Sequence, residues 1–133
     1  MARKNPNKKN NGANLGFEEK LWIPKLMKEF EKDSLKRNTP CNFKSRERVI
    51  KALAEVHAEL VLIHPFREGN GRTARILATL MALQADMPRL NFSSITGRKK
   101  REYIAAIHAG LGKNYRPMEK VFDLILTESG VVE

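Results

Sequence analysis

The sequence predicts an all-α protein built as a single domain. Its 133 residues suit one hydrophobic core. Apolar residues recur at helical spacing, most clearly over residues 49–63, where Val49, Leu53, Val56, Leu60 and Ile63 form a continuous stripe. No segment of any length alternates apolar and polar residues as a half-buried strand would, and no internal repeat is present.

Five helices are expected in order along the chain. Pro24 suits the first residue of the first helix, because the N–H that proline lacks has no partner there, and this helix should fade by residues 38–40. Ser45 is the expected N-cap of the second helix. That helix must stop at Pro65, because the residue before a proline avoids helical angles. Apolar spacing marks three further helices, over about residues 72–85, 103–110 and 121–126.

Charge and composition narrow the class of protein. Lysine and arginine number 25 against 15 acidic residues, so the net charge is +10, which favours anionic partners. The one cysteine, Cys41, excludes an intramolecular disulfide and a cysteine-based zinc site. No apolar run reaches the ~20 residues of a membrane span, and the basic N-terminus lacks the apolar stretch of a secretory signal. We therefore expect a soluble cytoplasmic protein without membrane partners.

The domain boundaries follow a change in composition. Residues 1–16 contain four basic residues, five asparagines, two glycines and no acid, which predicts a disordered basic tail. The structured domain is expected over residues 17–128, followed by a short C-terminal tail over residues 129–133.

One loop, HPFREGNGRTAR over residues 64–75, carries the residues suited to chemistry. Gly69 and Gly71 allow left-handed backbone angles and the close approach of a ligand. Successive N–H groups in such a turn form an anion-binding nest, and the helix N-terminus that follows also favours anions. The segment is not a P-loop, because no Gly-Lys-Ser/Thr follows the glycines.

The charged residues of this loop indicate a phosphate site. Arg72 and Arg75 lie three residues apart on one side of a helical turn, and their guanidinium groups match phosphate oxygens. Glu68 would repel phosphate unless a cation such as Mg²⁺ lay between them. His64 is a candidate general base near neutral pH. The alternative is a purely structural, well-capped turn whose arginines form surface salt bridges.

The loop resembles the signature of Fic domains, His-x-Phe-x-Asp/Glu-Gly-Asn-Gly-Arg-x-x-Arg, at every fixed position. The resemblance extends to the preceding AEVHAELVLIHPF and to the later EYIAA and NYRPMEKVF segments, and it covers about residues 17–126. It implies an all-α fold with the motif loop between two central helices. It also implies an enzyme that transfers AMP from ATP to a hydroxyl of a target protein.

The resemblance assigns a role to each motif residue. His64 would deprotonate the target hydroxyl, and Phe66 would anchor the loop in the core. Glu68 would hold Mg²⁺ on the α- and β-phosphates of ATP. Arg72 would contact the phosphate tail, and Arg75 would pair with the γ-phosphate.

The remaining nucleotide contacts are expected from the glycine turn and from later helices. The residues that would cradle the phosphates are Gly69, Asn70 and Gly71. Related members that transfer phosphate carry a lysine in place of a glycine, so the Gly-Asn-Gly here favours AMP transfer. The adenine-pocket candidates are Tyr103, Asn114 and Tyr115.

Target docking and regulation also follow from the resemblance. A β-hairpin flap that aligns the target segment would fall in about Asn14–Pro24. Many Fic proteins are silenced by a helix with Ser/Thr-x-x-x-Glu-Gly/Asn, and no such motif lies upstream here. Ser129 and Glu133 have the spacing but lack the final residue, so we interpret the pair as coincidental. An inhibitor would then be absent or a separate antitoxin protein.

The preferred function is AMP transfer to a Ser, Thr or Tyr hydroxyl, with MgATP as substrate. By resemblance the protein could be a bacterial toxin acting on a DNA topoisomerase. Two alternatives remain. One is a nucleic-acid-binding helical domain, favoured by the charge and by the basic run at residues 98–101. The other is a Fic scaffold that binds nucleotide without reacting. His57 and His108 are interpreted as packed or surface histidines rather than ligands.

Overall fold

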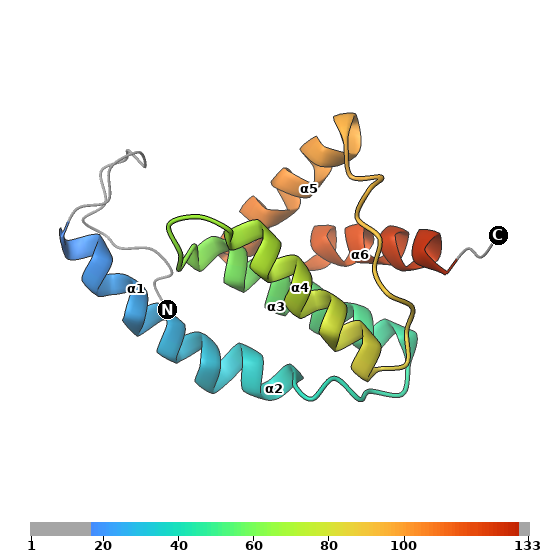
Figure 1. The fold of residues 1–133 in the computed structure, drawn as a ribbon, viewed down its shortest axis with the longest axis horizontal. Helices are drawn as coiled ribbons and strands as arrows, with labels where there is room; N and C mark the ends of the chain where they lie inside the picture. The colour runs from blue at the N-terminus through green and yellow to red at the C-terminus, as the bar shows by residue number, and fades with distance from the viewer. Residues whose placement is uncertain (1–16, 131–133) are drawn as a thin grey trace.

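The computed structural model describes residues 17–130, and this part of the chain is helical with no strand (Figure 1). The prediction of an all-α fold is confirmed. The elements in order are α1 (Phe17–Phe30), the π-helical turn η1 (Glu31–Leu35), α2 (Lys36–Asn38), α3 (Arg46–Ile63), α4 (Asn70–Gln84), α5 (Gly97–Ala109), the 3-10 turn η2 (Gly110–Gly112) and α6 (Arg116–Ser129). No helix in residues 17–130 has the length and apolarity to cross a membrane.

The first helix differs from the sequence expectation at its start. α1, η1 and α2 follow one another without a break and end at Asn38, as predicted, but α1 begins at Phe17 and holds Pro24 inside it. The β-hairpin expected over residues 14–24 is therefore wrong for residues 17–24. The physical reason is that Glu18, Glu19 and the residues after them are good helix formers with no strand pattern. Residues 14–16, like the whole basic tail, lie outside the described part.

Both ends of α3 are where the sequence places them. The Ser45 hydroxyl accepts a hydrogen bond from the Arg48 N–H at 3.1 Å, which satisfies one of the free N–H groups of the first turn. The helix ends at Ile63, and His64 takes left-handed angles, with φ 55° and ψ 57°, immediately before Pro65. These two boundaries fix the residue at which the motif loop begins.

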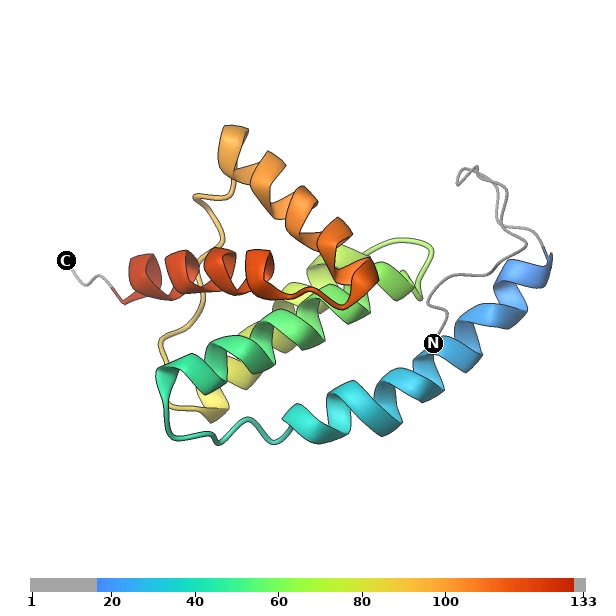
Figure 2. The same cartoon turned by 180° about the vertical axis from the view of Figure 1, so that it is seen from behind.

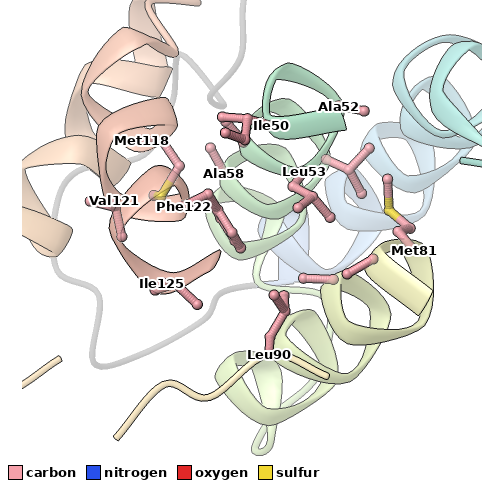
Figure 3. Packing of buried hydrophobic residues seen from close by; sticks show 14 of the residues in the cluster. Ile50, Ala52, Leu53, Ala58, Met81, Leu90, Met118, Val121, Phe122 and Ile125 are labelled. Carbon is pink, nitrogen blue, oxygen red and sulfur yellow. The ribbon is translucent and has the colours of Figure 1, made fainter. Parts of the chain in front are cut away.

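The core surrounds α3, which packs against α4 on one side and α6 on another (Figures 1 and 2). Val49, Leu53, Val56 and Leu60 of the predicted stripe are buried. Figure 3 shows this core close up, with Phe122 of α6 and Met81 of α4 on the two sides of α3. α5 packs across α6, and the turn η2 contacts α3. The packed pair α3 and α4 carries the motif loop at one end.

Candidate functional site

The motif loop over residues 64–69 joins α3 to α4, which run side by side in opposite directions (Figure 1). Gly69 is the N-cap of α4 with φ 83° and ψ 13°, and a Cβ at this position would meet nothing within 4 Å. Glycine is therefore favoured here because the backbone is left-handed, and not because a side chain would clash with a neighbour. The expectation that Gly69 takes left-handed angles is confirmed.

Gly71 does not take the left-handed angles expected of it. α4 begins at Asn70, two residues before the predicted Arg72, so Gly71 lies inside the first helical turn and is not left-handed. A Cβ on Gly71 would lie 3.2 Å from Nη1 of Arg75. Its missing side chain thus lets the Arg75 guanidinium fold back over the N-terminus of α4.

Asn70 holds the loop together. Its side chain is buried, its Oδ1 accepts from the Phe66 N–H at 2.8 Å, and its Nδ2 donates to the Phe66 carbonyl at 2.6 Å. Both ends of the amide are used within the loop. A phosphate could then meet the backbone N–H of this residue rather than its side chain.

Phe66 does not anchor the loop in the core, contrary to the expectation. Its side chain is 48% exposed. The loop is attached instead through Asn70, which binds both polar backbone groups of Phe66 and leaves the phenyl ring outside.

The electrostatics at this end of α4 favour an anion. No side chain caps the N-terminus of α4, and its first turn has no acidic residue. The first N–H to donate within the helix is that of Thr73, to the Gly69 carbonyl at 2.9 Å, which leaves the preceding N–H groups without a helical acceptor. Arg72 and Arg75 are exposed, and no ion pair among the described residues engages them. The purely structural alternative expects a capped turn with paired arginines, and the described residues provide neither.

His64 and Glu68 are exposed on the same short loop, close in sequence to the open end of α4. Within residues 17–130 no group of three or more potential metal ligands exists, so these residues offer no all-protein cage for a cation. A single free carboxylate such as that of Glu68 fits Mg²⁺, which usually takes one or two carboxylates together with the phosphate oxygens of its substrate.

The three adenine-pocket candidates have different surroundings. The Tyr103 hydroxyl lies 2.7 Å from Nε2 of His57, and the Asn114 side chain accepts from the Arg116 N–H at 3.3 Å. Tyr115 donates to the Glu59 carboxylate and lines a cavity of about 570 Å³ between α1, η1 and α3. Neither Tyr103 nor Asn114 lines that cavity.

His57 is a packed histidine, as predicted. It is 1% exposed, and burial lowers the pKa of its ring to about 4, so it is neutral at pH 7. Sequence reasoning missed its pairing with Tyr103, which lies on a different helix. The only sequence signal was a histidine bordering the apolar stripe of α3. His108 is exposed on α5, also as predicted.

Part of the basic run at the start of α5 is neutralised by acidic neighbours. Arg98 pairs with Glu102 at 3.9 Å, and Lys99 pairs with Glu128 at 3.4 Å. These pairs offset the unfavourable placement of cations at a helix N-terminus.

Comparison with known proteins identifies the family. The sequence model of the Fic/DOC family matches residues 2–82, which is more than half of the chain. The chain belongs to the Fic/DOC family. It is 38% identical over 68 residues to protein adenylyltransferase fic-1 of Caenorhabditis elegans, a match that covers 51% of this chain and 13% of the relative. It is 37% identical over 79 residues to a protein adenylyltransferase of Bartonella henselae, covering 59% of this chain and 14% of that protein.

A solved structure has a similar arrangement of helices. The crystal structure of BepC from Bartonella tribocorum, a VirB-translocated effector with AMPPNP bound, superposes with a TM-score of 0.63. The match has 30% sequence identity and covers 77% of this chain and 47% of BepC. This chain therefore spans less than half of that structure and about one-seventh of the two adenylyltransferases.

Proposed function

We propose that this chain is a protein adenylyltransferase that transfers AMP from MgATP to a Ser, Thr or Tyr hydroxyl of a target protein. One observation carries the proposal. The motif loop brings His64, Glu68 and the uncapped N-terminus of α4, with its two free arginines, to one end of the α3–α4 pair. The adenylyltransferase names of the relatives and the AMPPNP bound to BepC support it.

The phosphates of ATP would bind over the first turn of α4. The free N–H groups there and the positive end of the helix dipole point at the same space, as in other phosphate sites at helix N-termini. Arg72 would contact the phosphate tail, and Arg75, held close to Gly71, would pair with the γ-phosphate. Glu68 would hold Mg²⁺ on the α- and β-phosphates, where the cation would neutralise negative charge.

His64 would supply the base for the transfer. Its ring would take the proton of the target hydroxyl as that oxygen attacks the α-phosphorus. The bond from the α-phosphorus to the bridging oxygen of pyrophosphate breaks, and AMP stays on the target. The N-terminus of α4 and both arginines would stabilise the charge that develops on the departing pyrophosphate. The His64 side chain is exposed and not buried in the core, so it is available for this role.

The biological setting is inferred from the family alone. A role as a bacterial toxin, a DNA topoisomerase as target, a separate antitoxin as inhibitor and a cytoplasmic location all stay predictions. A target search that begins from labelled protein bands tests the topoisomerase assignment directly.

The proposal is tested by label transfer from α-labelled ATP with Mg²⁺, in bacterial lysate and with the protein alone. We expect label on a protein band with the wild type and none with the His64→Ala variant. His108→Ala, which removes an exposed histidine of α5, is the matched control and should transfer as the wild type does.

Equal labelling by wild type and the His64→Ala variant would refute the assignment of the base. If no label is transferred, the affinity for ATP decides between the alternatives. Binding without transfer would indicate an inactive scaffold. Absence of ATP binding together with salt-dependent DNA binding would favour the nucleic-acid-binding domain.

A further inference from the structure

A buried polar pair contacts α4 at Ala74, the fifth residue of that helix. The His57 ring of α3 has Nε2 2.7 Å from the Tyr103 hydroxyl of α5 and Nδ1 3.4 Å from the Ala74 carbonyl of α4. The ring is 1% exposed, and the aromatic rings of Phe92 and Phe122 lie beside it. One imidazole therefore connects three helices at the base of the candidate site.

The chemistry of the partners determines the tautomer of His57. A carbonyl oxygen only accepts hydrogen bonds, so Nδ1 must carry the ring proton and donate to Ala74. Nε2 is then the acceptor, and the Tyr103 hydroxyl donates to it. Because both nitrogens are occupied by partners on different helices, the pair specifies one placement of α4 relative to α3 and α5.

This pair is next to Arg75. Ala74, whose carbonyl His57 contacts, immediately precedes Arg75 in the chain, and the Arg75 Nη1 lies against Gly71. Burial lowers the pKa of His57 most strongly, and the charge of Arg75 lowers it as well, which agrees with a guanidinium close to the ring. The polar pair and the arginine therefore share one small region of the fold.

A purely space-filling role would not need these polar groups. An apolar side chain could fill the same volume without the cost of burying two ring nitrogens and a hydroxyl, so their presence indicates a requirement for orientation. We propose that His57 and Tyr103 are a positioning pair that fixes α4 at Ala74 and so aims the next residue, Arg75, at the nucleotide phosphates. The inference rests on the proposed function, because it requires that the site binds ATP.

The test compares the affinities for MgATP and AMP by titration calorimetry. Tyr103→Phe removes only the hydroxyl and keeps the ring. We expect it to weaken MgATP binding about tenfold, as for the loss of one buried hydrogen-bond partner, and to change AMP binding by less than about twofold. AMP lacks the β- and γ-phosphates that Arg75 would contact. His108→Gln, at an exposed position of α5, is the control and should leave both affinities unchanged.

A double-mutant cycle with Arg75→Ala separates positioning from general stability. If Tyr103 acts through Arg75, then Tyr103→Phe should cause no further loss of ATP affinity once the arginine is gone. Additive losses would overturn the proposal. Equal losses for ATP and AMP would also overturn it, because they would indicate direct contact of Tyr103 with adenine or damage to the fold.

A second measurement needs no variant. The ring ¹⁵N shifts of His57 in the folded wild type should report the tautomer protonated at Nδ1, and the tautomer protonated at Nε2 would contradict the pair. A wild type that binds no nucleotide would refute both this inference and the proposed function. ATP binding without AMP transfer would refute only the proposed function.

Discussion

The free energy of unfolding should respond in opposite directions when alanine replaces Gly69, at the end of the motif loop, and Gly71, in the first turn of α4. Gly69 has φ 83°, and a Cβ at this position would meet no atom within 4 Å. The alanine of Gly69→Ala would therefore not clash, and its only cost would be the left-handed backbone conformation. That conformation costs an L-residue about 1–2 kcal/mol. The lower entropy of the unfolded chain offsets about 0.5 kcal/mol of it. The free energy of unfolding should therefore fall by about 1 kcal/mol.

Gly71 lies in the first turn of α4 with helical angles, where alanine is the better residue. Gly71→Ala should raise the free energy of unfolding by about 0.5 kcal/mol. The new Cβ would lie 3.2 Å from the Arg75 Nη1, which is the end of a flexible side chain and can move aside. Since the displaced guanidinium is the proposed γ-phosphate ligand, ATP affinity should fall about fivefold, or ~1 kcal/mol.

Urea unfolding of the two variants and the wild type, with ATP titrations on the same samples, measures both effects. The urea midpoints of the two variants should lie on opposite sides of the wild-type midpoint. Their free energies of unfolding should differ by about 1.5 kcal/mol. Midpoints that move in the same direction would refute the reasoning. So would full ATP affinity in the Gly71→Ala variant.

Three further predictions concern the loop and the pair beneath it. Asn70→Ala should lower the free energy of unfolding by about 2 kcal/mol, because the Phe66 N–H and carbonyl lose their partner; an unchanged urea midpoint would contradict this. The pKa of His57 is held by burial at about 4, below its usual 6.5, so the unfolded chain binds an extra proton between these values. The titration of His57 should therefore lower the free energy of unfolding by about 3 kcal/mol as the pH drops from 6.5 to 4. Urea unfolding at each pH should show a shallower fall for the His57→Gln variant than for the wild type. Arg75→Ala should weaken MgATP binding whereas His64→Ala should leave it nearly unchanged, and calorimetry showing the reverse order would exclude the assigned roles.

The parts of the fold that were predictable are those set by local chemistry. Ser45 and Pro65 bound α3 because a cap and a proline act on their immediate neighbours. The stripe of α3 is buried because its spacing leaves one apolar face. The left-handed angles of Gly69 were expected for the same reason, since the conformational freedom belongs to the residue itself.

Two predictions failed for different reasons. Pro24 was expected to start a helix, but favourable residues before it extend α1 back to Phe17. The family resemblance placed Phe66 in the core, yet its side chain is 48% exposed and the buried residue is polar Asn70, whose amide bonds both polar backbone groups of Phe66. A single sequence does not indicate which of two neighbouring side chains turns inward.

The pairing of His57 with Tyr103 could not be read from the sequence either. The two residues are 46 positions apart, and only the packing of α5 against α3 brings the hydroxyl to the ring. A periodic pattern identifies the buried face of each helix but does not identify which residues of two helices meet.

We propose above all that this chain transfers AMP, rather than phosphate, from ATP to a target protein. The most direct test incubates the protein and Mg²⁺ with bacterial lysate and ATP labelled at the α-phosphorus, and in parallel with ATP labelled at the γ-phosphorus. We predict that the α-label appears on a protein band in a His64-dependent manner and that the γ-label does not. His64-dependent transfer of the γ-label, or no transfer of either label, would contradict the account.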